Sequence, residues 1–331
     1  MAHELDFTKD GKARMFYVSS EGLPWHGSGK GVSHVLTVQE ALTESGADFP
    51  VSKRHLFLMN ENDEAAIIPD HWAICRNDQP DGDNVLGVVK GRYIPIQNAE
   101  VFGLCDMLSG ENAACFHTAG VLKGGRRVWV LMKLPDIIEV ASGDNIDKYL
   151  LFTTSHDGTE AARLLFTPIR VVCQNTLSAA IGGRRGSRQG RVHHSGDIVA
   201  QFRNAAEVIG IATKVFDKSA EAYRALAGVQ MGTANAKNYF NHLVPDNPKA
   251  KFNTRAQNVR AAMLHLFENG RGSELASARG TMWGCYNAVS EYVDHLRMSR
   301  SNPDNRMWSS WFGTGGGLRS RAFTEALASV R

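Results

Sequence analysis

The chain has 331 residues, of which 43% are hydrophobic and 21% are charged, and its formal net charge is +3. This composition is that of a folded globular protein and excludes a disordered tail. It also excludes a strongly basic protein, so a nucleic-acid site would have to concentrate its positive charge locally. At roughly 150 residues per domain, the length predicts two lobes, with one large domain as the alternative.

The cysteines and the apolar runs predict where the chain works. Five cysteines are spread along it without a CxxC pair, which disfavours zinc knuckles and redox motifs and is typical of buried thiols in a reducing cytoplasm. The first residues lack the apolar run of a signal peptide, and no stretch of about 18 apolar residues occurs. We therefore expect a cytoplasmic protein with no membrane partner.

Residues 1–50 are predicted to form an irregular loop followed by a helix. Thr37 can cap this helix, and Glu40 stands three residues further on, as a capping box requires. The helix is expected to end before Pro50.

Residues 51–182 are predicted to form an antiparallel sheet lobe. Segments 55–59, 71–76 and 86–96 are β-rich, and a helical period interrupts them at 98–110. Two hairpins follow, with "KGG" as the turn within 113–135 and "HDGTE" as the turn within 148–172. Their order indicates an α+β fold, in which helices pack on an antiparallel sheet.

A basic loop at 183–196 and a mainly helical lobe at 197–331 complete the predicted organisation. The helical pattern covers 173–183, 196–228, 253–272, 277–298 and a last helix in the tail. The glycine run "GTGGGL" (313–318) lacks the last glycine of a dinucleotide fingerprint and is interpreted as a flexible hinge.

No catalytic motif is complete. "WHGSGKG" fails as a phosphate-binding loop, because the first glycine is missing and Lys30 is followed by glycine. The histidines show no metal-ligand spacing, so we expect no metal and no cofactor, although a metal site assembled from residues far apart in the sequence stays open. If the protein were a nuclease or a nucleotide-modifying enzyme, Asp81, Asp83 and Asp157 are the carboxylates that could hold Mg²⁺; a plain turn explains "QPDGDN" equally well.

Positive charge is concentrated in one window. Between Ala161 and Gly196 there is no Asp or Glu, while six arginines occur. Glycines separate four of these arginines in "GGRRGSRQGR" (182–191), so their guanidinium groups could follow an irregular phosphate chain. An inert charged loop and an oligomer contact are the alternatives.

Two further motifs mix cations with aromatic residues. "LKGGRRVW" and "VKGRY" are expected on neighbouring strands, where cations can hold phosphates and rings can stack on bases. Exposed lysines and arginines also protect sheet edges, so a structural role stays open. The predicted nucleic-acid-binding residues are Lys90, Arg92, Lys123, Arg126, Arg127, Arg163, Arg170, Arg184, Arg185, Arg188 and Arg191.

Several motifs together resemble the phage/plasmid-like protein family, whose domain has no known function. They are "PWHGSG", "GRYIPIQNAEVF", "AGVLKGGRRVWVLMKLP", "SHDGTEAARLLFTPIRVVCQNTL" and "MWGCYNAVSEYVDH". The resemblance runs from about residue 2 to 325 and departs at the glycine-rich insert 182–190. It implies a gene of a bacterial mobile element, acting in the host cytoplasm. The element order over 86–182 is also similar to ring-forming single-strand annealing proteins of the Rad52-like kind, a likeness of fold only.

The favoured hypothesis is a non-catalytic single-stranded DNA-binding protein that serves recombination, replication or transcription, and that forms a homo-oligomer. The metal-dependent nuclease or nucleotide-modifying enzyme and a virion or host-interaction protein are the alternatives.

Overall fold

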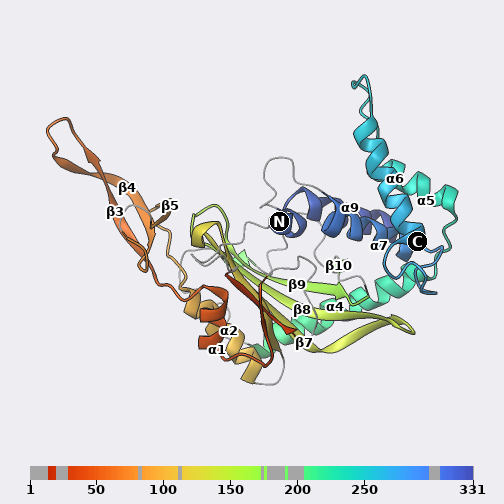
Figure 1. The fold of residues 1–331 in the computed structure, drawn as a ribbon, viewed down its shortest axis with the longest axis horizontal. Coiled ribbons are helices and arrows are strands. Elements are labelled where there is room, and N and C mark those ends of the chain that lie inside the picture. Colours follow the sequence, from red (N-terminus) through yellow and green to blue (C-terminus); the bar gives the residue numbers. More distant parts are fainter. Residues whose placement is uncertain are drawn as a thin grey trace.

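The computed structural model describes residues 14–19, 29–80, 84–110, 114–172, 175–176, 191–192, 205–297 and 306–330. Its main sheet has the strand order β10-β9-β8-β7-β6-β1-β2, with β11 also paired to β9 (Figure 1). All neighbours are antiparallel except the β1–β2 pair. The strands are β1 (Met15–Val18), β2 (Lys30–Val32), β6 (Cys115–Leu122), β7 (Arg127–Ala141), β8 (Asp144–Ser155), β9 (Ala162–Arg170), β10 (Asn175–Thr176) and β11 (Arg191–Val192).

A second sheet stands apart from the first. It contains β3 (Val51–Met59), β4 (Ala65–Arg76) and β5 (Val85–Lys90) in the order β3-β4-β5. Figure 1 shows its β3–β4 hairpin projecting from the body of the molecule, and we call the three strands the β3–β5 arm. The antiparallel α+β class is therefore confirmed, but residues 51–182 form two sheets rather than one.

Alternation along the central strands gives the main sheet two apolar faces. Val128, Val130 and Met132 of β7 lie in one core cluster, while Trp129 and Leu131 lie in the other. Both clusters are buried, as a sheet covered on its two faces requires.

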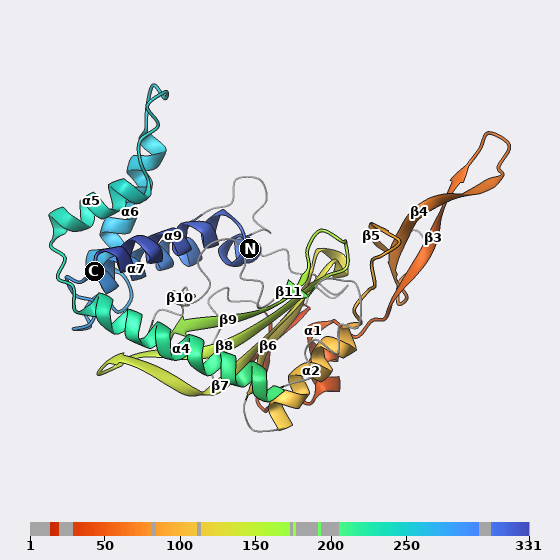
Figure 2. The same ribbon diagram turned by 180° about the vertical axis from the view of Figure 1, so that it is seen from behind.

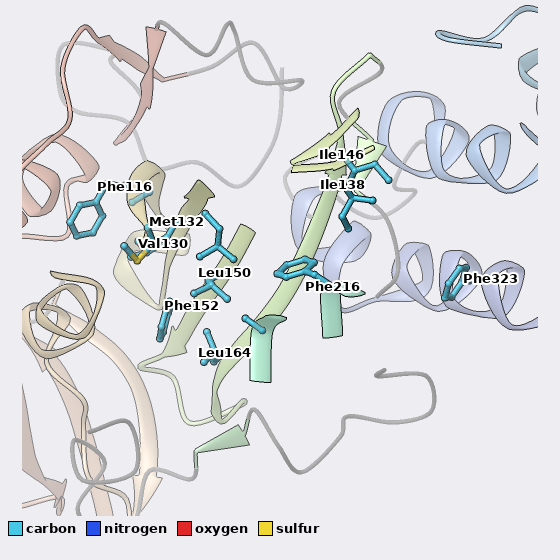
Figure 3. Close-up of a cluster of buried hydrophobic side chains, with 14 of the residues drawn as sticks. Phe116, Val130, Met132, Ile138, Ile146, Leu150, Phe152, Leu164, Phe216 and Phe323 are labelled. Atoms are coloured by element: carbon cyan, nitrogen blue, oxygen red, sulfur yellow. The ribbon is translucent and has the colours of Figure 1, made fainter. Parts of the chain in front are cut away.

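Helices cover the first face. α4 (Ala205–Ala227) crosses the strands in Figure 2, and Phe216 lies 6.1 Å from Phe166 of β9 between ring centroids. Figure 3 shows Phe216 beside Ile138 and Ile146 in this cluster. α1 (Val38–Ser45) and α2 (Asn98–Gly110) cover the other end of the face, next to β6.

The predicted N-terminal helix is confirmed together with its cap. The Thr37 hydroxyl accepts a hydrogen bond from the Glu40 amide, and the Glu40 carboxylate accepts one from the Thr37 amide at 2.8 Å. Gly46 ends the helix in the left-handed conformation, with φ of 70°. The helix thus begins and ends before Pro50, as its local sequence dictates.

The described residues from Ala205 onward are mainly helical, as predicted. The helix predicted over 277–298 is shorter at both ends, because 277–280 form turns, Thr281 pairs with Gln230 in a β-bridge and 292–296 form a π-helix. The elements are α5 (Thr233–Leu243), α6 (Thr254–Asn269), α7 (Met282–Glu291), the π-turn η4 (Tyr292–Leu296), α8 (Arg306–Trp311) and α9 (Thr314–Ala328). Helices α5, α6, α7 and α9 lie together at one end of the main sheet (Figure 1).

The predicted glycine hinge is wrong. Gly315, Gly316 and Gly317 lie in the first turns of α9. A Cβ on Gly316 would stand 2.6 Å from the carbonyl oxygen of Trp311, so the glycine allows α9 to pack directly against the end of α8. The glycine run at 313–318 therefore marks a close approach of two helices and not a hinge.

Two other predicted elements also need correction. Residues 175–176, which we assigned to a helix, form strand β10, because their backbone completes the edge of the sheet beside β9. The strand predicted over 86–96 ends at Lys90, where Gly91 and Arg92 turn the chain toward α2. In the part of the chain that the structure describes, no helix is both long and apolar enough to cross a membrane.

Candidate nucleic-acid interface

The base of the β3–β5 arm meets the main sheet at the turn between β8 and β9. The Tyr93 hydroxyl donates to the Ser155 carbonyl at 2.8 Å, and the His156 amide donates to the Arg126 carbonyl at 2.7 Å. A Cβ on Gly87 would lie 2.6 Å from the Asp157 Cα, so β5 packs closely on this turn. Two motifs that are far apart in sequence, "VKGRY" and "LKGGRR", therefore lie around one turn, although on different sheets and not on neighbouring strands.

A buried arginine holds the third segment at this junction. Arg76, at the end of β4, donates to the Gly124 carbonyl at 3.0 Å and forms an ion pair with Asp78 at 2.7 Å. Its guanidinium lies 3.8 Å from the ring centroid of Phe49. The β6–β7 turn, with its predicted cations, is thereby fixed against the arm. We call this junction, residues 86–93, 122–127 and 155–158, the arm base.

Three of the predicted cations are exposed at the arm base. Lys90, Arg92 and Arg126 are exposed, and no ion pair of the described residues involves them. The Lys90 ammonium lies 2.8 Å from Nε2 of the His71 ring. Lys123 is half-buried in the β6–β7 turn, at a positive φ of 57°. Lys90, Arg92 and Arg126 thus present their charge to solvent, where an anionic ligand can reach it.

The remaining predicted arginines whose side chains the structure describes are paired with carboxylates inside the protein. Arg127 and Arg163 share Glu160, at 3.4 and 3.2 Å. Arg163 also lies over the ring of Phe312, with its guanidinium carbon 4.7 Å from the centroid. Glu160 immediately precedes the acid-free window, so the window looked uncompensated only because it began one residue later.

Arg170 is fully buried and serves the fold. Its Nε and Nη2 donate to the two carboxylate oxygens of Asp144 at 2.6 and 2.8 Å. Ser277 and Trp283, from the helical half, donate to the same carboxylate at 2.6 and 2.9 Å. Burial acts to raise the pKa of Asp144, but the hydrogen bonds and charge of Arg170 outweigh it and hold that pKa below 3.8. This guanidinium has no surface to offer a ligand.

Arg184, Arg185 and Arg188 lie outside the described residues, and Arg191 is described only through its backbone, which pairs with Arg163 on β9. Asp81 and Asp83 also lie outside the described residues.

Sequence reasoning missed an aromatic and basic group on the arm itself. The Trp72 and His55 rings lie 3.9 Å apart between centroids, and the Lys53 ammonium lies 4.8 Å from the Trp72 centroid. Arg54 is exposed on the same strand. The letters "SKR" at 52–54 carried the signal, but they stand just before the strand predicted over 55–59 and were not included in it.

Asp157, the carboxylate considered for metal binding, is occupied by its own turn. Its Oδ1 accepts hydrogen bonds from the Ser155 hydroxyl, the Thr159 amide at 3.0 Å and the Thr159 hydroxyl. Burial raises the pKa of Asp157, but these hydrogen bonds outweigh it and lower the pKa overall. Among the described residues, no group of three or more His, Cys, Asp or Glu is arranged to hold a metal ion.

The family of the chain is shown by residues 85–311, which match the model of a family described as a domain of unknown function, DUF932. This match spans more than half of the chain, and the protein belongs to that family. A search of curated proteins found no match. A search of solved structures found none either.

Proposed function

We propose that the protein binds single-stranded nucleic acid, most favourably DNA, at the arm base, without catalysing a reaction. The observation that carries the proposal is the exposure of Lys90, Arg92 and Arg126 at one junction, where none of the three forms an ion pair with a carboxylate of the described residues. Phosphates are bound by such cations, and the resulting affinity does not require a specific base sequence.

Aromatic side chains near these cations support a single strand over a duplex. Trp72 is partly exposed on β4, next to the arm base, and its ring already contacts a cation and a histidine ring. Unpaired bases stack on aromatic rings, whereas bases in a duplex are already stacked on one another. We extend the interface to Lys123 and to the four loop arginines 184, 185, 188 and 191, whose contribution remains a prediction. Arg127, Arg163 and Arg170 are left out, because each is paired with an internal carboxylate.

The wider setting of this binding is also a proposal. The motifs that resemble phage/plasmid-like proteins favour a mobile-element gene, with a role in recombination, replication or transcription. The likeness to Rad52-like annealing proteins rests on element order alone.

The test is a comparison of two triple variants in a gel-shift assay with single-stranded and double-stranded DNA and RNA. Lys90→Ala/Arg92→Ala/Arg126→Ala removes three charges at the arm base, and we expect it to weaken binding about 10- to 100-fold at physiological salt. The matched control, Lys214→Ala/Lys218→Ala/Lys237→Ala, removes the same charge from exposed positions on α4 and α5.

The control variant should bind like the wild type, which separates a local site from the effect of net charge. Equal loss of affinity in the two variants would refute a site at the arm base. Binding that prefers duplex DNA would refute the single-strand assignment.

A further inference from the structure

The far end of the β3–β5 arm exposes an unusual amount of apolar surface. Strand β5 pairs with β4 only from His71 to Cys75, so beyond that point the arm is a two-stranded ribbon. Phe57, Leu58 and Met59 are 54%, 63% and 55% exposed, and Ile67 opposite Phe57 is 55% exposed. We call residues 56–70 the distal arm; Figure 1 shows it clear of the rest of the molecule.

A two-stranded ribbon with exposed apolar side chains is expected to bind a partner. Two strands alone are marginally stable in water, and neighbouring exposed apolar side chains on a protruding element mark an interaction surface. Phe57 and Met59 lie on one face of the ribbon and Leu58 on the other, because side chains alternate along a strand. Packing one face of the ribbon against the rest of the chain would therefore not bury Phe57, Leu58 and Met59 together. Another molecule has to cover them.

The two edges of the distal arm differ in what they can accept. Along β4, Pro69 has no amide hydrogen and Asp70 has a φ of +54°, and each of these interrupts a further strand pairing. Strand β3 contains no proline or glycine and stands at the outer edge of the order β3-β4-β5. The β3 edge is therefore the open one.

The distribution of charge along the arm favours an antiparallel partner strand over a parallel one. The tip carries Glu61, Asp63 and Glu64, whereas the inner part of β3 carries Lys53 and Arg54. A second β3 strand laid antiparallel and centred on the apolar Phe57–Leu58 pair would put each acidic tip opposite the other chain's basic segment. A register centred on Phe57 sets Lys53 opposite Glu61, and a shift of one residue sets Arg54 opposite Glu61. Parallel pairing would instead put like charges together.

We propose that the distal arm is a self-association surface, in which the β3 edges of two copies of this chain pair antiparallel about a two-fold axis. The two arms then form one continuous sheet, and the exposed apolar side chains of each copy pack on those of the other. Such an isologous contact is self-complementary, as the charge layout requires. A nine-residue strand is about 30 Å long, so we expect a modest interface and a dissociation constant in the micromolar range.

Sedimentation velocity of the full chain without nucleic acid, at about 1–100 µM, tests the dimer and its surface independently of DNA binding. Phe57→Ser/Leu58→Ser should raise the dissociation constant about 100-fold or more. The control, Ile137→Ser/Phe252→Ser, changes two side chains that are 51% and 75% exposed elsewhere and should leave it unchanged. A wild type that stays monomeric overturns the proposal, even if another protein or DNA binds the arm. A dimer that Phe57→Ser/Leu58→Ser leaves intact, but that the control variant dissociates, overturns the proposal as well.

A charge exchange tests the antiparallel geometry. Arg54→Glu and Glu61→Lys should each weaken self-association roughly tenfold, because each replaces attraction by repulsion at both symmetry-related ends. A mixture of the two variants should restore dimers, now of one chain of each kind. If the mixture stays as weak as the separate variants, the antiparallel arrangement is overturned. Thermal unfolding midpoints equal to that of the wild type would show that both variants are folded.

Discussion

The carboxylate of Asp144 should be the most sensitive single group in the described structure. It accepts four hydrogen bonds: two from Arg170 and one each from Ser277 and Trp283. These donors come from β9 and from the helical half, so one buried group joins the sheet to the helices. Asp144→Asn keeps the shape but removes the charge that pairs directly with the buried guanidinium of Arg170.

The magnitude follows from burial. Asp144 and Arg170 are both 0% exposed, so water cannot replace the lost partner. Breaking one member of such a pair costs about 3–5 kcal/mol of unfolding free energy. The matched control is Asp246→Asn, whose ion pair with Arg260 has a similar length of 2.8 Å but an Asp side chain that is 53% exposed. That control should cost less than about 1 kcal/mol.

Urea denaturation followed by far-ultraviolet circular dichroism measures both losses. A double-mutant cycle with Arg170→Met should show strong coupling, because removing both charges leaves no unpaired ion in the core. If Asp144→Asn costs no more than the surface control, or if its effect simply adds to that of Arg170→Met, the account of this junction is refuted.

The same pair predicts a pH dependence. The folded pKa of Asp144 lies below its ordinary value of 3.8, so its stabilisation is complete above that value and is lost as pH falls through the folded pKa. The stability difference between the wild type and Asp144→Asn should therefore be constant at neutral pH and shrink below about pH 4. A difference that grows on acidification would contradict the lowered pKa.

Two further predictions concern the helices. Gly316→Ala should destabilise the protein by about 1–3 kcal/mol, since its Cβ would clash with the Trp311 carbonyl, whereas Gly317→Ala, with no atom within 4 Å, should be neutral or slightly stabilising; equal thermal shifts would contradict the close α8–α9 approach. Thr37→Ala should cost about 1 kcal/mol by removing the capping box, and Thr37→Ser should restore most of it, both measured by urea denaturation; an unchanged midpoint for Thr37→Ala would show that the cap is dispensable.

The sequence predicted local structure best where a short-range signal decides the outcome. The capping box at Thr37, the hairpin turn at "KGG" and the turn at "HDGTE" all depend on residues within a few positions of one another. These features appear where they were expected, because backbone hydrogen bonds over three or four residues fix them.

Features set by distant partners were not predictable in this way. The separation of the arm from the main sheet depends on packing between β5 and the β8–β9 turn, which share no sequence signal. The neutralisation of Arg170 depends on Asp144, which lies across a strand pair and outside the acid-free window. A count of charges in a window therefore overstated the basic surface, and only the three-dimensional pairing separates exposed cations from buried ones.

The most direct test of the central proposal is the salt dependence of binding to a labelled single-stranded oligonucleotide, measured by fluorescence anisotropy between about 50 and 200 mM salt. Each phosphate contact contributes about 0.7 to the slope of log affinity against log salt for a single strand. We predict a steep slope for the wild type, and a slope shallower by about 2 for Lys90→Ala/Arg92→Ala/Arg126→Ala. Salt-independent binding, or an unchanged slope in the triple variant, would contradict a phosphate-binding site at the arm base.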